Sequence, residues 1–285
     1  MPKAPGRIPR ARDEPTQHAS ISTSTMTRPQ KPNAFDVLMA PKTRATTEPV
    51  RKTGHGPRQN TWGREGLGGY IWEPDAWQAT RIVRHTEKFV VIKDMFPKAS
   101  VHYLILPVDN STVIPHDAFE DPKFLSECKE EVKAVRHLVA EELRRLYGQF
   151  SESDQPRIAA MEAADLVVPL PSGRDWEKEV ISGIHARPSM RNLHIHVLSR
   201  DMVNHHMKTI DHYQSFTTDF LVPLEEFPLV PDDVRRPQGF PPEHRDFQII
   251  RNKGMTCWRC GANFKNKFAD LKRHLAIELE EWKRE

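Results

Sequence analysis

The chain has 285 residues, of which 38% are hydrophobic and 28% charged, and its formal net charge is +3. This length suits one sizeable domain and a smaller one, and no window approaches the roughly 18 consecutive apolar residues of a membrane span, so we expect no membrane association. Three cysteines cannot form a disulfide framework, and the N-terminus lacks the apolar run of a secretory signal. We therefore expect a reducing compartment, where paired cysteines more often hold a metal.

Residues 1–60 form a distinct basic segment. They contain eleven Lys or Arg against four Asp or Glu, nine prolines and a single aromatic residue, Phe35. With so little apolar surface, the segment cannot offset the entropy cost of ordering, and we predict a disordered tail. It is either a solvated tail without a partner or a flexible arm that raises the affinity for nucleic acid or for nuclear import.

Order is expected to begin near Trp62, and a hairpin and a long helix follow. The runs FVVIKD (89–94) and VHYLILP (101–107) are typical of strands, and the turn MFPKAS joins them. Between residues 123 and 148, apolar side chains recur every three or four positions, which predicts an amphipathic helix ended by Gly148. Cys128 lies on the apolar stripe of this helix and is therefore expected in the core.

A further strand is predicted over residues 193–199, with the sequence LHIHVLS. Because side chains alternate along a strand, His194 and His196 share one face, whereas Ile195 and Val197 point to the other. Two imidazoles are thus expected side by side over a sheet.

A proline-rich passage, 223–242, leads to a C-terminal module with metal-ligand spacing. Cys257 and Cys260 form a CxxC turn; thirteen residues later comes His274, and Glu278 follows one helical turn after it. Two cysteines on a turn and two ligands on one helix face can surround a tetrahedral zinc ion, as in small ββα fingers, with a carboxylate as the fourth ligand. The alternative is a CxxC turn without metal, but so small a module can scarcely fold without such a link.

The module is also basic. From position 251 to position 274 there are seven Lys or Arg and one acid, which favours contacts with phosphates. The alternative is a merely soluble surface. The candidate DNA-binding residues are Lys265, Lys267, Lys272 and Arg273.

A second constellation comprises His185 in the loop SGIHARPSM, His194 and His196 on the later strand, and His102 on the hairpin. This set suits phosphoryl transfer, since a neutral imidazole is a nucleophile toward phosphorus and a second, protonated imidazole can protonate the leaving oxygen. We expect no catalytic metal. The competing hypothesis is a metal site on these histidines with Asp201 as the nearest acidic ligand.

These residues carry a family resemblance. The segment GIHARPSMRNLHIHVLSRD resembles the signature of the histidine-triad (HIT) nucleotide hydrolases and transferases. Together with VVIKDMFPKASVHYLILP, DHYQSFTTDF and the finger, it resembles the aprataxins, DNA deadenylases of strand-break repair, in the fungal form that lacks a forkhead-associated domain. The resemblance covers roughly residues 60–285.

The resemblance implies an α+β fold: a HIT domain with an antiparallel sheet and helices, plus a small ββα-like C2HE zinc finger. The expected organisation is a disordered basic tail (1–60), a HIT catalytic domain (61–222), and a linker with the DNA-binding finger (223–285). One structural zinc ion is expected.

The implied activity is hydrolysis of 5′-adenylated DNA ends left by abortive ligation, through a covalent histidine–AMP intermediate, with AMP as product. We expect a nuclear enzyme that is a monomer and binds nicked or broken DNA. Any protein partners in repair are left open.

The resemblance also assigns catalytic roles. His194 matches the nucleophile, His185 the general acid and His196 a phosphate-binding residue. Asn192 stands where the triad has its first histidine, so this position cannot titrate, and we hypothesise that His102 orients the nucleophile instead.

Several further positions match substrate-binding residues. Trp62 resembles an aromatic residue that stacks on the terminal base pair, a contact worth about 1–3 kcal/mol per base. The others are Lys98 and Ser189 at the phosphates, Asp94 at the ribose, and Val91 and Ile92 at the adenine.

Two other functions compete with deadenylation. One is hydrolysis of a small nucleotide, a phosphoramidate or a dinucleoside polyphosphate, on the same fold; a free nucleotide needs neither a basic finger nor Trp62. The other is a non-catalytic DNA-binding scaffold, against which the presence of His185, His194 and His196 together argues.

Overall fold

The computed structural model describes residues 64–109, 115–163 and 169–285. The disorder predicted for residues 1–60, and the stacking role predicted for Trp62, lie outside the described residues. No helix in the described ranges is both long and apolar enough to cross a membrane.

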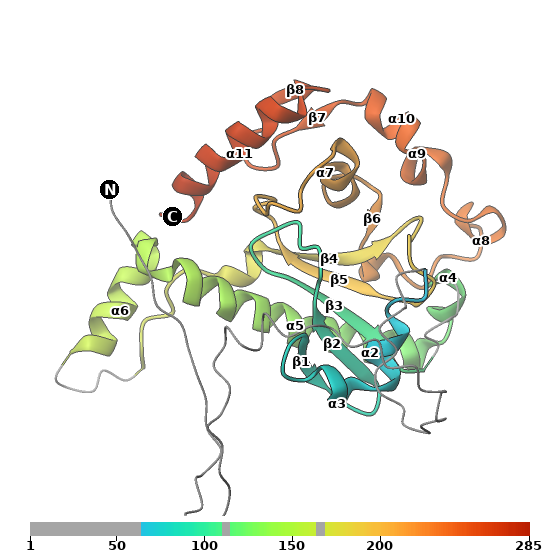
Figure 1. Cartoon of the computed structure of the whole chain (residues 1–285), viewed down its shortest axis with the longest axis horizontal. Helices are drawn as coiled ribbons and strands as arrows, with labels where there is room; N and C mark the ends of the chain where they lie inside the picture. Colours follow the sequence, from blue (N-terminus) through green and yellow to red (C-terminus); the bar gives the residue numbers. More distant parts are fainter. Residues whose placement is uncertain (1–63, 110–114, 164–168) are drawn as a thin grey trace, which may run out of the picture. The chain divides into compact units, whose positions relative to one another are not determined.

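An antiparallel sheet of six strands, in the order β1-β2-β3-β5-β4-β6, forms the centre of the fold (Figure 1). The predicted hairpin is confirmed, because β2 and β3 pair in antiparallel register across the MFPKAS turn. The strands are β1 Ile82–His85, β2 Phe89–Lys93, β3 His102–Pro107, β4 Val180–His185, β5 Ile195–Ser199 and β6 Leu221–Val222.

The predicted long helix is α5, Pro122–Tyr147, with Gly148 at its C-terminal end. It begins at Asp121, whose side chain accepts a hydrogen bond of 2.9 Å from the Lys123 backbone N–H, with Pro122 in the first turn where its missing N–H costs nothing. The other helices are α2 Gly68–Trp72, α3 Pro74–Trp77, α4 Pro115–Ala118, α6 Gln155–Glu162, α7 Ile210–Thr217, α8 Arg235–Gln238, α9 Pro242–Arg245, α10 Phe247–Asn252 and α11 Phe268–Trp282.

Helix α5 covers one face of the sheet (Figure 1). Ile195 and Val197 of β5 point to this face and join the main core with Val91 and Ile105. Cys128 on α5 is fully buried in the same core, as predicted. The alternation predicted for β5 therefore holds, and it leaves the opposite face for the histidines.

The opposite face carries two smaller apolar clusters. Helix α2 packs through Ile71 on Ile92 and Leu104 of the hairpin. Farther along, Leu198 of β5 lies in a cluster with Phe216 of α7 and with residues of the C-terminal module. The histidines lie on this face, between the two clusters.

The C-terminal module is a ββα unit of β7 Met255–Thr256, β8 Asn263–Lys265 and α11. It packs on α7: the Tyr213 hydroxyl donates to the Thr256 carbonyl at 2.8 Å and accepts from the Trp258 N–H at 3.1 Å. The far end of α11 reaches the main core, where Trp282 is 1% exposed. Two separate contacts, one with α7 and one with the main core, thus attach the module to the rest of the fold.

The proline-rich passage also belongs to the main core. Leu224, Phe227, Leu229 and Phe240 are buried there. This passage therefore packs as part of the larger domain. The predicted domain boundary between residues 222 and 223 remains a prediction.

Candidate functional site

Strand pairing brings the four predicted histidines together. In the register, His196 lies opposite Leu104 of β3 on one side and Gly183 of β4 on the other. The His196 ring is central: its centroid lies 4.3 Å from that of His185, 5.0 Å from that of His194 and 5.2 Å from that of His102.

His194 directly precedes β5, which begins at Ile195 and not at residue 193 as predicted. Its Nδ1 lies 2.7 Å from the backbone carbonyl of Asn192. Because a carbonyl only accepts, Nδ1 carries the proton, and the lone pair is on Nε2. Burial lowers the pKa of His194, partly opposed by the Asn192 hydrogen bond, so the ring is neutral at pH 7.

Asn192 contributes its main chain to this arrangement. Its side chain is buried, and Oδ1 has no hydrogen-bond partner within the described ranges. The group that orients His194 is therefore the carbonyl of residue 192, which explains how asparagine can replace histidine at the first triad position.

A chain of hydrogen bonds sets the tautomer of His196. The Lys98 backbone N–H donates to His102 Nδ1 at 3.2 Å, so the proton of neutral His102 is on Nε2. That nitrogen lies 3.0 Å from Nδ1 of His196, which must accept. The proton of His196 is therefore on Nε2, a buried atom without a partner among the described residues.

This geometry corrects one hypothesis. His102 contacts His196, and the residue that orients His194 is Asn192. His102 is fully buried, and burial lowers its pKa to about 4, so it is neutral and holds the tautomer described above.

His185, predicted in a loop, is instead the last residue of strand β4, and it closes the cluster. Its Nε2 is buried and unpartnered in the part of the chain that the structure describes, and its ring contacts Phe216 and Phe220. Burial lowers the pKa of His185 well below 6.5, and the neighbouring His194 lowers it further. A small cavity of about 10 Å³ borders His185 and His194.

Two charged residues flank the imidazoles. Asp94 Oδ1 accepts from the Phe96 N–H at 2.7 Å, while its Oδ2 lies 3.5 Å from His102 Nε2. Burial lowers the pKa of Lys98, whose ammonium donates to the Phe96 carbonyl. Ligand atoms of Asp94, His102 and His196 lie within 4.8 Å of one another, but the facing nitrogens of the two histidines already share a hydrogen bond.

The other predicted substrate-binding residues do not lie together in the structure. Ile92 lies on the face of the histidines, next to Leu104. Val91 points into the core under α5 and is 0% exposed, so its assignment to the adenine pocket is corrected: adjacent strand residues cannot face the same side. Ser189 is exposed on the loop between β4 and β5.

This loop is tied to the start of the described chain. The Arg191 N–H donates to the Arg64 carbonyl at 2.7 Å, and the Arg191 guanidinium pairs with Glu65 at 2.7 Å. The segment just before α2 therefore lies against the loop between β4 and β5.

Sequence reasoning missed the supporting roles of Asp201, which it named only as a possible metal ligand, and of Gly183. Asp201 accepts hydrogen bonds from the Ser100 N–H at 2.9 Å and the Ser199 hydroxyl at 2.5 Å, which tie the segment just before β3 to the end of β5. Among the described residues, the carboxylate whose oxygen lies within 4.8 Å of His102 and His196 ligand atoms is Asp94 and not Asp201. Gly183 allows β6 to approach, since a Cβ there would lie 2.6 Å from the Val222 carbonyl oxygen. The contacts of Asp201 with Ser100 and of Gly183 with Val222 have no local sequence signal, because these partners are distant along the chain.

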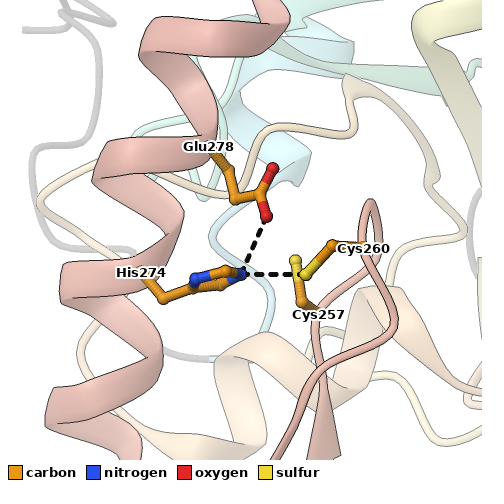
Figure 2. A group of neighbouring side chains, drawn as sticks. All are labelled: Cys257, Cys260, His274 and Glu278. Atoms are coloured by element: carbon orange, nitrogen blue, oxygen red, sulfur yellow. Dashed lines mark hydrogen bonds and ion pairs between the residues drawn. The ribbon is translucent and has the colours of Figure 1, made fainter.

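The four predicted metal ligands converge (Figure 2). His274 Nε2 lies 3.1 Å from Cys260 Sγ and 3.0 Å from Glu278 Oε1, and the ligand atoms of all four residues lie within 4.8 Å of one another. Two sulfurs, one imidazole and one carboxylate at these separations fit a tetrahedral zinc ion. Burial raises the pKa of Glu278, but hydrogen bonds with Cys260 and Arg259 outweigh it, so the carboxylate is ionised and ready to coordinate.

The basic residues of the module lie on its surface. Lys265, Lys267 and Lys272 are exposed, and Arg273 pairs with Asp270 one turn earlier on α11. These cations are accessible to a phosphate backbone.

Comparisons with known proteins agree with both halves of this description. Residues 217–281 match the family model described as "C2HE / C2H2 / C2HC zinc-binding finger", and residues 74–212 match "Scavenger mRNA decapping enzyme C-term binding".

The chain is similar to curated aprataxin-like proteins. The aprataxin-like protein of Saccharomyces cerevisiae is 30% identical over 224 residues, which cover 76% of this chain and 95% of the relative. That of Schizosaccharomyces pombe is 27% identical over 250 residues, covering 88% and 94%.

Solved structures give the same result. The aprataxin ortholog Hnt3 in complex with DNA superposes with a TM-score of 0.56 at 25% identity, covering 77% of this chain and 96% of that one. Hnt3 in complex with DNA and guanosine gives a TM-score of 0.57 with the same coverage. With the histidine cluster, the C2HE finger and near-full-length similarity to the yeast proteins, this chain belongs to the aprataxin family.

Proposed function

We propose that this protein is a DNA 5′-adenylate hydrolase, which removes AMP from the adenylated 5′ ends that abortive ligation leaves at breaks. The observation that carries the proposal is His194, a neutral imidazole with its Nε2 lone pair free, beside His185 and His196, whose buried Nε2 atoms are unpartnered in the described structure. Similarity to the DNA-bound aprataxin ortholog supports DNA as the substrate.

The first step transfers the nucleotide to the enzyme. His194 Nε2 attacks the phosphorus of AMP, a P–N bond forms, and the P–O bond to the DNA 5′-phosphate breaks. His185, once protonated, gives its proton to the departing oxygen. The negative charge of a bound diphosphate raises the pKa of His185, which burial holds low in the free enzyme.

The site stabilises the charge that develops in this step. The Nε2–H of His196 is a fixed donor for a phosphoryl oxygen, and Lys98 supplies a nearby cation. As the His194 ring becomes a phosphorylated imidazolium, its Nδ1–H bond to the Asn192 carbonyl strengthens.

The second step releases AMP. Water attacks the phosphorus, the P–N bond breaks, and His194 recovers its neutral ring. His185, now unprotonated, accepts the proton of the water. The products are AMP and a DNA end with a 5′-phosphate.

The finger holds the broken duplex. One structural zinc ion on Cys257, Cys260, His274 and Glu278 would fix the ββα unit, and the exposed lysines of the module would contact phosphates. Monomeric action and location in the nucleus are part of this proposal; the basic composition of residues 1–60 supports the latter.

Trapping the intermediate tests the proposal. The full chain is mixed with a nicked duplex whose 5′-adenylate carries a ³²P label and is quenched in denaturant at neutral or alkaline pH, because P–N bonds are acid-labile. Labelled protein is expected with the wild-type chain and not with His194→Ala. Equal turnover by His194→Ala would refute the mechanism.

A comparison of substrates tests the function itself. AMP release from the nicked adenylated duplex is measured beside release from free diadenosine polyphosphate. A higher kcat/KM for the free dinucleotide would favour the small-nucleotide hydrolase, and no release from either would favour the non-catalytic scaffold.

A further inference from the structure

The carboxylate of Glu278 faces two partners at once. Its Oε1 lies 3.0 Å from His274 Nε2, inside the metal-ligand cluster, and its Oε2 accepts a hydrogen bond from Arg259. In Figure 2 one oxygen of Glu278 is directed toward His274, while the other points away from the two cysteines. The two oxygens therefore have separate tasks, one inside the cluster and one outside it.

Arg259 stands between the two cysteine ligands in the CxxC turn. Besides Glu278, it bonds Glu285 through Nε at 3.1 Å and Nη2 at 2.5 Å, and Glu281 through Nη1 at 3.1 Å. All three glutamates belong to the C-terminal end of α11 or the residues just after it. A single guanidinium thus joins the turn that carries the sulfur ligands to the helix that carries the other two.

The net charge of the zinc ligand set explains why Glu278 needs the contact with Arg259. A zinc ion with two thiolates and two histidines is neutral, whereas one with two thiolates, one histidine and one carboxylate carries a charge of −1. Glu278 is only 6% exposed, so this extra charge is poorly solvated and needs a buried or half-buried partner. Within the described ranges, Arg259 is the arginine or lysine that forms an ion pair with Glu278.

We infer that Arg259 is a positioning residue of the zinc centre: it holds Glu278 as a ligand through one oxygen and neutralises the extra charge that a glutamate ligand brings. Arginine suits this role because its planar fork can bond Glu278 and Glu285 at the same time and remains charged at every working pH. The matching family model covers C2HE, C2H2 and C2HC fingers, so the fourth ligand varies within the family. Arg259 is the residue that adapts this chain to the glutamate form.

The effect of removing Arg259 on zinc binding should depend on which residue is the fourth ligand. If Arg259 acts through the Glu278 carboxylate, its removal harms the site only while residue 278 is a glutamate. Replacing Glu278 with histidine restores a neutral ligand set, and Arg259 is then dispensable for metal binding. A guanidinium that merely ties the turn to Glu281 and Glu285 would matter equally in both backgrounds.

The experiment measures zinc affinity on the full chain by competition with a chromophoric chelator. Four proteins form the cycle: wild type, Arg259→Ala, Glu278→His and the double variant. Arg273→Ala is the matched control, because it removes the same charged group from the same module and contacts Asp270, which is not a ligand. Arg259→Ala is expected to weaken zinc binding about 10- to 100-fold. In the Glu278→His background the same change should weaken zinc binding by less than about threefold, and Arg273→Ala should leave the zinc affinity unchanged.

Cobalt substitution supplies a readout of geometry. With one carboxylate oxygen bound, Co²⁺ in the wild-type site should show the intense visible bands of a four-coordinate ion. In Arg259→Ala the freed Oε2 can also bind, and the bands should weaken as the coordination number rises. Circular dichroism of the zinc-loaded proteins shows whether each variant is folded.

The outcomes separate this inference from the proposed catalytic function. An equal loss of affinity in the glutamate and histidine backgrounds, or no loss in either, overturns the role of Arg259 and leaves deadenylation untouched. A wild-type chain that binds no zinc overturns the zinc centre and the inference with it. Failure to release AMP from adenylated DNA bears on the catalytic proposal alone.

Discussion

Trp282, at the end of α11, provides the sharpest test of how the finger is attached to the catalytic domain. Its ring is 1% exposed and makes edge contacts with Tyr147, Trp176 and Trp258 at centroid distances of 5.8, 5.8 and 6.2 Å. Its indole N–H donates to Glu179 Oε2 at 2.8 Å. Tyr147 and Trp176 belong to the catalytic domain, so the contacts of Trp282 cross from one module to the other.

The burial and contacts of Trp282 set the expected loss of unfolding free energy in its variants. Removing a fully buried tryptophan leaves a large cavity and costs about 3–5 kcal/mol of unfolding free energy. Trp282→Phe keeps most of the apolar contacts and loses the hydrogen bond to the Glu179 side chain, which costs about 1–3 kcal/mol. We therefore expect the order wild type, Trp282→Phe, Trp282→Ala in decreasing stability.

Urea denaturation of the zinc-loaded chain, followed by far-ultraviolet circular dichroism, measures these differences. Trp72→Ala is the control, because Trp72 is 66% exposed and its loss should cost less than about 1 kcal/mol. The reasoning is refuted if Trp282→Ala and Trp72→Ala lose the same stability, since α11 would then not be anchored through its last turn.

Four further predictions concern the site and its supports. His102 has a pKa of about 4 in the folded chain and about 6.5 in the unfolded chain, so the unfolded chain binds more protons as the pH falls below 6.5. Between pH 7 and pH 5 we therefore expect His102 to cost about 2 kcal/mol of unfolding free energy. Urea melts at both pH values should show that His102→Gln removes this loss. Asn192→Ala should keep kcat within about threefold in the adenylate assay, because the main-chain carbonyl of residue 192, and not its side chain, orients His194; a 100-fold drop would contradict this. Gly183→Ala should cost about 1–3 kcal/mol by urea melts, because β6 must move away. Lys267→Ala with Lys272→Ala should lower the salt slope of DNA binding by about two, measured by fluorescence anisotropy, and an unchanged slope would exclude phosphate contacts there.

The sequence predicts those parts of the fold that depend on the spacing of apolar residues within one segment. The hairpin, α5 and the face alternation of β5 each follow from periodicity within a single segment. The same rule should have excluded Val91 from the substrate side, because Val91 and Ile92 are adjacent on one strand.

Other features depend on contacts between distant segments and had no local signal. β6 is two residues long and pairs with the end of β4 only because Gly183 lacks a side chain. The proline-rich passage carries Phe227 and Phe240 into the main core, although its composition is typical of a linker. The histidines were predictable as a group, but their hydrogen-bond order was not, because the partner of His102 is set by sheet register.

The hydrogen bond from the Lys98 amide to His102 has a consequence for inherited or engineered variation. That amide belongs to the turn between β2 and β3 and forms no hydrogen bond with His196 itself, yet through His102 it decides which nitrogen of His196 carries hydrogen. A substitution that tilts the turn by a few tenths of an ångström could reverse both tautomers and present a lone pair to an anionic phosphate. Such an enzyme would be folded, zinc-loaded and able to bind DNA. It would lose activity because the ring protons of His102 and His196 had each moved to the other nitrogen.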